Sequence, residues 1–268
     1  MLQQAIDFRE ESDAIFALLD GIGGLDDQVW ETKTQFKEWT INNIIAHLHM
    51  GNYAADLSLQ DTKAFQDLVQ EFTSGNKEHG RLAFTDAWLD GLRDRALLNH
   101  WRDYYVEMAD RFTDADPKRR VKWFGPDMSV RSSITARLME TWAHSQAVYD
   151  VLGKTRTDVD RIKNVVVIGM NTFGWTFKNR EMAMPADIPS LRLSAPSGEI
   201  WEWNHPSEES CIEGSAVEFC QVVTQVRNIA DTTLRVVGEP ATAWMSIAQC
   251  FAGPPQDPPA PGSRFRQV

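Results

Sequence analysis

Hydrophobic residues recur at helical spacing through most of the first 182 residues. Over 4–22 and again over 38–59, apolar side chains fall at every third or fourth position, as in helices with one buried face. Thr40 precedes the second apolar run, and threonine is a favoured N-cap residue. Further helices are predicted over 84–112 with Thr85 as a candidate cap, over 125–153 between Pro126 and Gly153, and over 158–181. Long helices with short links favour a helical bundle.

The pattern changes to alternation after residue 184. Residues 191–195 and 199–203 alternate apolar and polar side chains around a Pro-Ser-Gly turn, which predicts a β-hairpin. Two more strand candidates are each followed by a helical stretch, in the order 211–214, 215–230, 232–238 and 239–252. The sequence therefore predicts an α+β protein with a helical bundle over 1–184, a small α+β domain over 185–255 and a Pro-rich tail over 256–268 that is extended or disordered.

Charge and cysteine content narrow the classes of function. The 268 residues carry a formal net charge of −11, and the only short basic run is 116–122, so nucleic acid is not an expected partner. The longest apolar run, 165–170, is too short to cross a bilayer, and the N-terminus lacks the pattern of a signal peptide. Three cysteines without CxxC spacing predict buried free thiols. We expect a soluble cytoplasmic protein, a monomer or homodimer, that acts on a small molecule.

A carboxylate and an imidazole interrupt the apolar stripe of the 125–153 helix. Glu140 and His144 lie one turn apart on the side that continues into Ala147, Val148 and Val151. An unpaired buried charge costs several kcal/mol, so these groups must be paired with each other, protonated or bound to a cation. The residues alone leave these alternatives open.

A metal site would need a third ligand from another helix. His47 is preferred over His49, because its neighbours on the same side of the helix are small or apolar and Gly51 leaves space there. Together with Glu140 and His144 it would form a set of two histidines and one carboxylate. Such a set without thiolates is typical of open, catalytic zinc sites, in which each ligand atom lies about 2.0 to 2.2 Å from the ion. Zinc is the leading candidate, and Fe²⁺, Ni²⁺ and Mn²⁺ remain alternatives.

Two segments resemble a known family. Residues 38–48, EWTINNIIAHL, resemble the Trp-Ser/Thr and His-Leu signature of DinB-like proteins, in particular the mycothiol-dependent maleylpyruvate isomerase-like family. Residues 137–144, RLMETWAH, resemble the Glu-x-x-x-His segment of that family. The resemblance covers about residues 1–255 and implies the bundle, the small C-terminal domain and a metal triad of His47, Glu140 and His144. Segments such as FGWTF at 173–177 look closer to an uncharacterised subgroup described only as metal-binding.

The resemblance also implies a type of chemistry. In the related isomerase a low-molecular-weight thiol is understood to add to an activated double bond, which rotates before the thiol leaves. We therefore expect a metal-dependent, thiol-using isomerase or S-transferase for a small acidic metabolite, with mycothiol as one candidate thiol. A thiol-independent metal-dependent hydrolase or lyase, and a non-catalytic metal-binding or ligand-binding protein, are the alternatives.

An acidic substrate needs a cationic anchor, for which two arginines are candidates. Arg137 lies one turn before Glu140, although a salt bridge or a role in positioning the ligands would also explain it. Arg227 is the second candidate, because the related isomerase is thought to use an arginine of its C-terminal domain; an ordinary surface arginine is the alternative. Three aromatic residues are candidates for a pocket wall or for the core: Trp142, Phe173 and Trp175.

Overall fold

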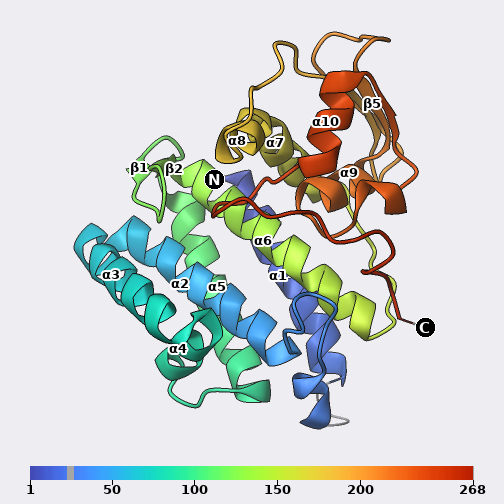
Figure 1. Cartoon of the computed structure of the whole chain (residues 1–268). Coiled ribbons are helices and arrows are strands. Elements are labelled where there is room, and N and C mark those ends of the chain that lie inside the picture. The colour runs from blue at the N-terminus through green and yellow to red at the C-terminus, as the bar shows by residue number, and fades with distance from the viewer. Residues whose placement is uncertain (23–26, 268) are drawn as a thin grey trace. The chain divides into compact units, whose positions relative to one another are not determined.

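Helices dominate the described part of the chain, residues 1–22 and 27–267 of a computed structural model (Figure 1). The chain divides into two compact units, Met1–Val148 and Tyr149–Val268. Within the described residues, no helix has the length and apolar character needed to cross a membrane. The predicted α+β class, a helical N-terminal part followed by a small α+β part, is confirmed.

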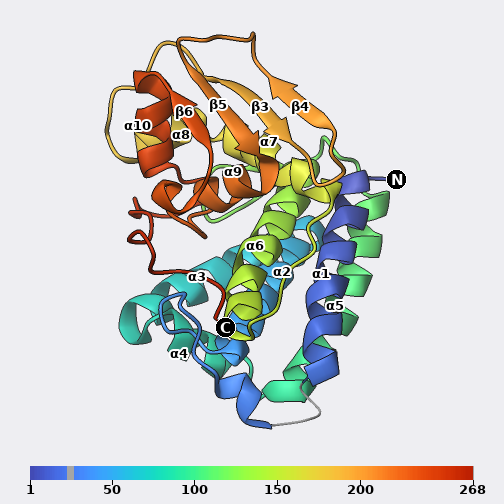
Figure 2. The same cartoon turned by 90° about the vertical axis from the view of Figure 1, so that its right-hand side faces the viewer.

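The first unit is built around long helices. In Figure 2, α1 and α5 run side by side, α2 packs on α5, and α3 and α4 lie against α2. A short hairpin, in which Arg120 pairs with Ser129, leads into the last helix. The elements are α1 (Gln3–Ile22), η1 (Asp27–Glu31), α2 (Ile41–Gln60), α3 (Thr62–His79), α4 (Arg81–Trp88), α5 (Asp94–Asp114), β1 (Arg120–Val121), β2 (Met128–Ser129) and α6 (Val130–Val151).

The start of α2 is fixed by a capping box. The Thr40 hydroxyl accepts a hydrogen bond from the backbone N–H of Asn43, and the Asn43 side chain accepts one from the backbone N–H of Thr40. These contacts satisfy N–H groups that lack partners within the helix. The predicted N-cap at Thr40 is confirmed. Because the cap fixes the residue at which α2 begins, it also fixes the side of the helix on which each later side chain lies.

The predicted helix over 84–112 is wrong, because the chain turns in its middle. Asp90 and Gly91 have φ angles of 49° and 82°, in the left-handed region that ends helices. α4 ends at Trp88 and α5 begins at Asp94. Thr85 is not a cap; it lies inside α4 and its hydroxyl donates to the carbonyl of Arg81.

The second unit combines short helices with a four-stranded sheet. Its elements are η2 (Asp160–Ile162), α7 (Lys163–Asn171), α8 (Phe173–Asn179), β3 (Ser190–Ser194), β4 (Ile200–Trp203), β5 (Cys211–Ser215), α9 (Ala216–Val223), η3 (Ile229–Asp231), β6 (Arg235–Val237) and α10 (Glu239–Ile247). The strand order is β4-β3-β5-β6. The predicted β3–β4 hairpin is confirmed, and β5 then pairs parallel to β3. The three cysteines are free and buried, as predicted.

The second unit begins earlier in the chain than predicted, and its tail makes specific contacts. The predicted domain boundary follows residue 184, whereas α7 and α8 group with the second unit because they pack on α9 and α10. The tail up to residue 267 forms no helix or strand, but it is held by hydrogen bonds. Arg264 donates to the carbonyl of Gln225, and the backbone N–H of Gln267 donates to the carbonyl of Asp150. The tail is therefore held in place by these contacts, with a turn near Pro261 and Gly262; Val268 lies outside the described residues.

Candidate metal centre

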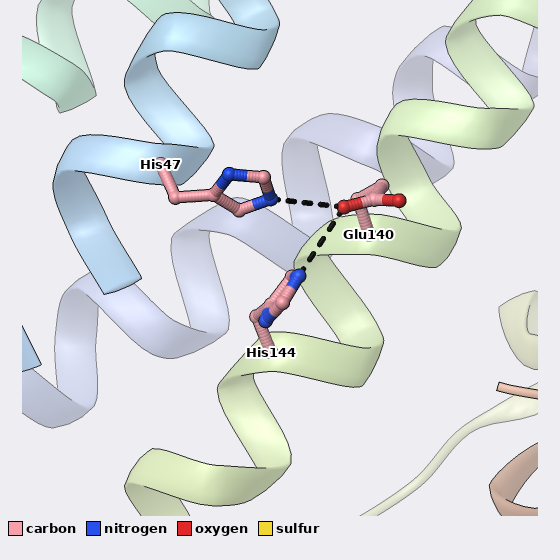
Figure 3. A group of neighbouring side chains, drawn as sticks. All are labelled: His47, Glu140 and His144. Carbon is pink, nitrogen blue, oxygen red and sulfur yellow. Dashed lines mark hydrogen bonds and ion pairs between the residues drawn. The ribbon is translucent and has the colours of Figure 1, made fainter. Parts of the chain in front are cut away.

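Two helices of the first unit bring two imidazoles to one carboxylate. His47 of α2 and His144 of α6 each place Nε2 next to the same oxygen of Glu140, at 3.1 and 3.3 Å (Figure 3). The two imidazole centroids lie 4.6 Å apart. The side chains are largely shielded from solvent, with exposed fractions of 16%, 13% and 22% for His47, His144 and Glu140. Residues that are far apart in the sequence thus form one partly buried cluster.

Helix geometry explains the convergence. Glu140 and His144 are four residues apart on α6, so their side chains lie on the same face. His47 lies two turns after the capped start of α2, on the side that faces this part of α6. The three residues to which the spacing and the family resemblance pointed are therefore brought together by the fold.

The charges of the cluster suit a cation. Burial raises the pKa of Glu140, but hydrogen bonds from His144 and His47 outweigh this and hold the pKa well below its ordinary value. Burial, together with the nearby His144, lowers the pKa of His47 to about 4. At neutral pH the carboxylate is thus charged and His47 is neutral, and these are the protonation states that bind metals.

The donor set also fits a metal ion in its spacing. One ligand atom from each of the three residues lies within 4.8 Å of the other two. Four ligands at zinc-like bond lengths around a tetrahedral ion are separated by about 3.4 Å, close to the observed nitrogen–oxygen distances. The three residues could therefore hold one divalent cation with little rearrangement.

Two aromatic residues that sequence reasoning missed lie against the histidines. Trp39 stacks on His144 with an interplanar angle of 8° and a centroid distance of 5.9 Å, and it meets His47 edge-on at 5.3 Å. Phe36 meets His144 edge-on at 4.8 Å. Trp39 belongs to the 38–48 segment that resembles the family signature, so the sequence marked it as a notable residue. The sequence did not show that its ring would contact the two histidines.

The loop that carries these aromatic rings is tightly folded. Lys37 and Glu38 have φ angles of 52° and 56°, a conformation that is unfavourable for residues other than glycine. The Thr34 hydroxyl donates to the carbonyl of Trp39, and the backbone N–H of Thr34 donates to the same carbonyl at 2.8 Å. This closed loop fixes Phe36 and Trp39 beside the imidazoles.

The reason given for preferring His47 over His49 is wrong, although the fold does place His47 in the cluster. His49 is the more buried of the two, with 2% of its surface exposed, and it packs against Trp88 and Tyr104. The space beside Gly51 is filled by the guanidinium of Arg137, not by the imidazole of His47. What places His47 rather than His49 in the cluster is the side of α2 on which each lies, and not how well each is shielded from water: His47 lies on the side that faces α6, and His49 does not.

Comparison with known proteins places the chain in a family. The sequence profile of the mycothiol maleylpyruvate isomerase N-terminal domain matches residues 8–149, which include the whole His47, Glu140 and His144 cluster. The chain belongs to this family. Two uncharacterised proteins from two strains of Mycobacterium tuberculosis are each 34% identical to it over 249 residues, which is 93% of this chain and 95% of the relative.

Solved structures show the same fold. A crystal structure of a mycothiol-dependent maleylpyruvate isomerase aligns with a TM-score of 0.50 and 16% identity, over 82% of this chain and 87% of that one. A structure of a point mutant of such an isomerase aligns with the same TM-score and 15% identity. At these identities the likeness extends to the fold alone.

Arg137 of this family member is held inside the bundle. Only 3% of its surface is exposed, its Nε donates to the side-chain oxygen of Asn52 at 3.0 Å, and an Nη donates to the carbonyl of Leu48. This arrangement favours a role in the interior over direct capture of substrate. Trp142 is fully buried and lies two residues from both Glu140 and His144, so it points about 200° around α6 from each. That position favours the core alternative.

The other candidates lie in the second unit. Arg227 pairs with Asp150 at 2.7 Å, and both side chains are largely buried. Phe173 is 1% exposed and packs edge-on against Trp244, whereas Trp175 is half-buried and its ring N–H donates to the carbonyl of Phe251. Arg227 is therefore engaged in an ion pair, and the substrate roles of all three residues stay predictions.

Acid should destabilise the metal-free protein through this cluster. His47 is protonated near pH 6.5 in the unfolded chain but only near pH 4 in the folded protein. Between these values the unfolded chain binds more protons, so the stability that neutral His47 allows is complete above pH 6.5 and is lost as the pH falls toward 4. We expect the free energy of unfolding to fall by about 3 kcal/mol between pH 7 and 4, with a further loss from Glu140 below 4.5. Denaturant unfolding in the presence of a chelator measures this. A His47→Gln variant should lose most of the dependence between pH 6.5 and 4.5, and an unchanged profile would contradict the assignment.

Proposed function

We propose that the chain is a metal-dependent enzyme that uses a low-molecular-weight thiol to isomerise, or to transfer a group to or from, a small acidic metabolite. The convergence of His47, Glu140 and His144 on one point is the observation that carries the proposal. Membership of the mycothiol maleylpyruvate isomerase N-terminal domain family and the fold shared with a mycothiol-dependent isomerase support the thiol and the reaction class.

The cluster would hold a divalent cation, with zinc as the leading candidate. A bound cation of this kind lowers the pKa of a coordinated thiol or water and polarises a carbonyl. Glu140 supplies the negative charge, and His47 supplies a neutral imidazole at physiological pH. Phe36 and Trp39 pack against the imidazole rings and would restrict their orientation. Three protein ligands leave a coordination position for a substrate or a thiol.

The distribution of cysteines supports an external thiol. Residues 1–148, the unit that contains the cluster, include no cysteine. Cys211, Cys220 and Cys250 are all in the second unit and buried, and burial raises the pKa of Cys220 well above its ordinary value. A thiolate nucleophile at the cluster would therefore come from a small molecule that binds there.

The test is activity of the zinc-loaded protein on maleylpyruvate and related unsaturated acids, with and without mycothiol. We expect turnover only when metal and thiol are both present, and glutathione serves as the control for thiol identity. Turnover that is indifferent to thiol would instead support a metal-dependent hydrolase or lyase. A protein that binds metal but turns over none of these substrates would favour the binding-protein alternative.

Trp39 should control how firmly the metal is held. Loss of a residue that orients a metal ligand commonly costs 10 to 100-fold in affinity, so Trp39→Leu should release zinc about tenfold faster or more, and Trp39→Phe should have a smaller effect. Transfer of zinc to a chromophoric chelator measures the rate. Trp88→Leu is the matched control, because Trp88 packs on His49, and no ring contact joins it to the cluster among the described residues. Equal effects of the two leucine variants would mean that the stacking on His144 has no special role.

A further inference from the structure

Arg137 is a buried cation without a carboxylate partner among the described residues. Its hydrogen-bond acceptors are an amide oxygen of Asn52 and the backbone carbonyl of Leu48, both neutral. By contrast, the largely buried Arg227 pairs with the carboxylate of Asp150 at 2.7 Å. A guanidinium that gives up its hydration for neutral acceptors destabilises the fold, so stability alone does not explain its presence.

The fold is shaped to accept this guanidinium. A Cβ at Gly51 would lie 2.6 Å from the central carbon and from both Nη atoms of Arg137, so the flat face of the group rests on the backbone of α2. Any larger residue at position 51 would displace it. Asn52, which is fully buried, orients the group through its oxygen, while its own Nδ2 has no acceptor among the described residues.

The position of the Arg137 guanidinium, beside Gly51 and Asn52, is next to the cluster on both α2 and α6. Arg137 precedes Glu140 by three residues on α6, so the two side chains occupy neighbouring positions on one helix face. On α2, Leu48 directly follows His47. Glu140 is the charged group whose field acts on Arg137, and burial, which is the larger effect, lowers the pKa of the arginine despite it.

A divalent cation held by one carboxylate and two neutral imidazoles keeps a net positive charge. Arg137 adds a second fixed charge in the same buried region, and the Asn52 N–H adds a donor without an acceptor. Positive potential in a region shielded from water acts more strongly than the same charge at the surface. These groups together favour an anion over a neutral molecule.

We propose that Arg137, seated on Gly51 and oriented by Asn52, is a positioning charge that makes the metal centre select an anionic ligand, a thiolate or a carboxylate, for its open position. This rests on the proposed function, since it requires a metal at His47, Glu140 and His144. Arg137 acts through its field and does not itself capture the substrate.

The test is ligand binding to the full-length protein loaded with Co²⁺, followed through the visible spectrum of the metal. The probes are acetate, 2-mercaptoethanol and neutral imidazole. Arg137→Met should weaken acetate or 2-mercaptoethanol binding about tenfold or more, leave imidazole within about twofold, and leave Co²⁺ bound. The anion that is affected identifies the ligand that the charge selects. Arg137→Lys, which keeps the charge, should recover most of the loss.

Two further results separate the explanations. Gly51→Ala keeps the charge of Arg137 but displaces its guanidinium, so it should also weaken the binding of the anionic probes and leave imidazole binding unchanged. If Arg137→Met does not fold, the result for Gly51→Ala tests the proposal alone. An equal loss for all three probes, or unchanged anion binding in both variants, would overturn the inference. A wild-type protein that gives no cobalt spectrum would instead mean that the proposed metal function fails.

Discussion

Replacing Glu140 with glutamine is expected to weaken zinc binding by more than about 100-fold and to remove metal-dependent activity. Glu140 is the only carboxylate of the cluster, and one of its oxygens contacts both imidazoles. Loss of residues that merely support a ligand costs 10 to 100-fold, so loss of the charged ligand itself should cost more. Competition with a chromophoric chelator measures the affinity.

The control for the Glu140 variant is Asp56→Asn, which makes the same chemical change elsewhere in the bundle. Asp56 is fully buried on α2, and its carboxylate accepts hydrogen bonds from Arg111 and Tyr104. This variant should lose stability but keep its affinity for zinc. If Glu140→Gln retained zinc within about threefold of the wild type, Glu140 would be a structural partner of the two histidines and not a metal ligand.

Replacing Asp150 with alanine is expected to destabilise the second unit by about 3 to 5 kcal/mol. The Asp150 and Arg227 side chains are 4% and 12% exposed and 2.7 Å apart, so the change leaves a nearly buried guanidinium without its partner. Denaturant unfolding monitored by circular dichroism measures the loss. The double variant Asp150→Ala/Arg227→Met should recover part of it, because the Arg227 charge is removed together with its partner, whereas Arg264, on which the charge of Asp150 also acts, keeps its own charge.

Equal stabilities of the single and double variants would show that the ion pair is not the source of the effect. The same pair bears on the role of Arg227. A substrate carboxylate at Arg227 would have to compete with Asp150, so an anchoring role requires this contact to loosen. Arg227→Met tested for substrate affinity and for stability separates the two roles.

Local sequence signals predicted much of the fold. The capping threonine at position 40 and the Pro-Ser-Gly hairpin between β3 and β4 were predicted correctly, because both depend on contacts within a few residues. The break between α4 and α5 was missed, because Asp90 adopts a left-handed conformation in the middle of an otherwise helical pattern. The parallel pairing of β3 with β5 depends on long-range contacts that periodicity does not encode.

The candidate site was predictable only as a set of residues. The spacing of Glu140 and His144, together with the family resemblance, led to the three side chains that the fold brings together. Their surroundings were not predictable. Which rings would touch His144, and the fact that Arg137 would fill the space beside Gly51, depend on how α2, α6 and the loop before α2 pack together.

The most direct test of the central claim is an X-ray diffraction experiment on crystals of the natively purified protein, with anomalous data collected on both sides of the zinc absorption edge. The account predicts one anomalous peak within bonding distance of Nε2 of His47, Nε2 of His144 and a carboxylate oxygen of Glu140, with room for a further ligand. A cluster with no such peak, in crystals grown with zinc present, would contradict it.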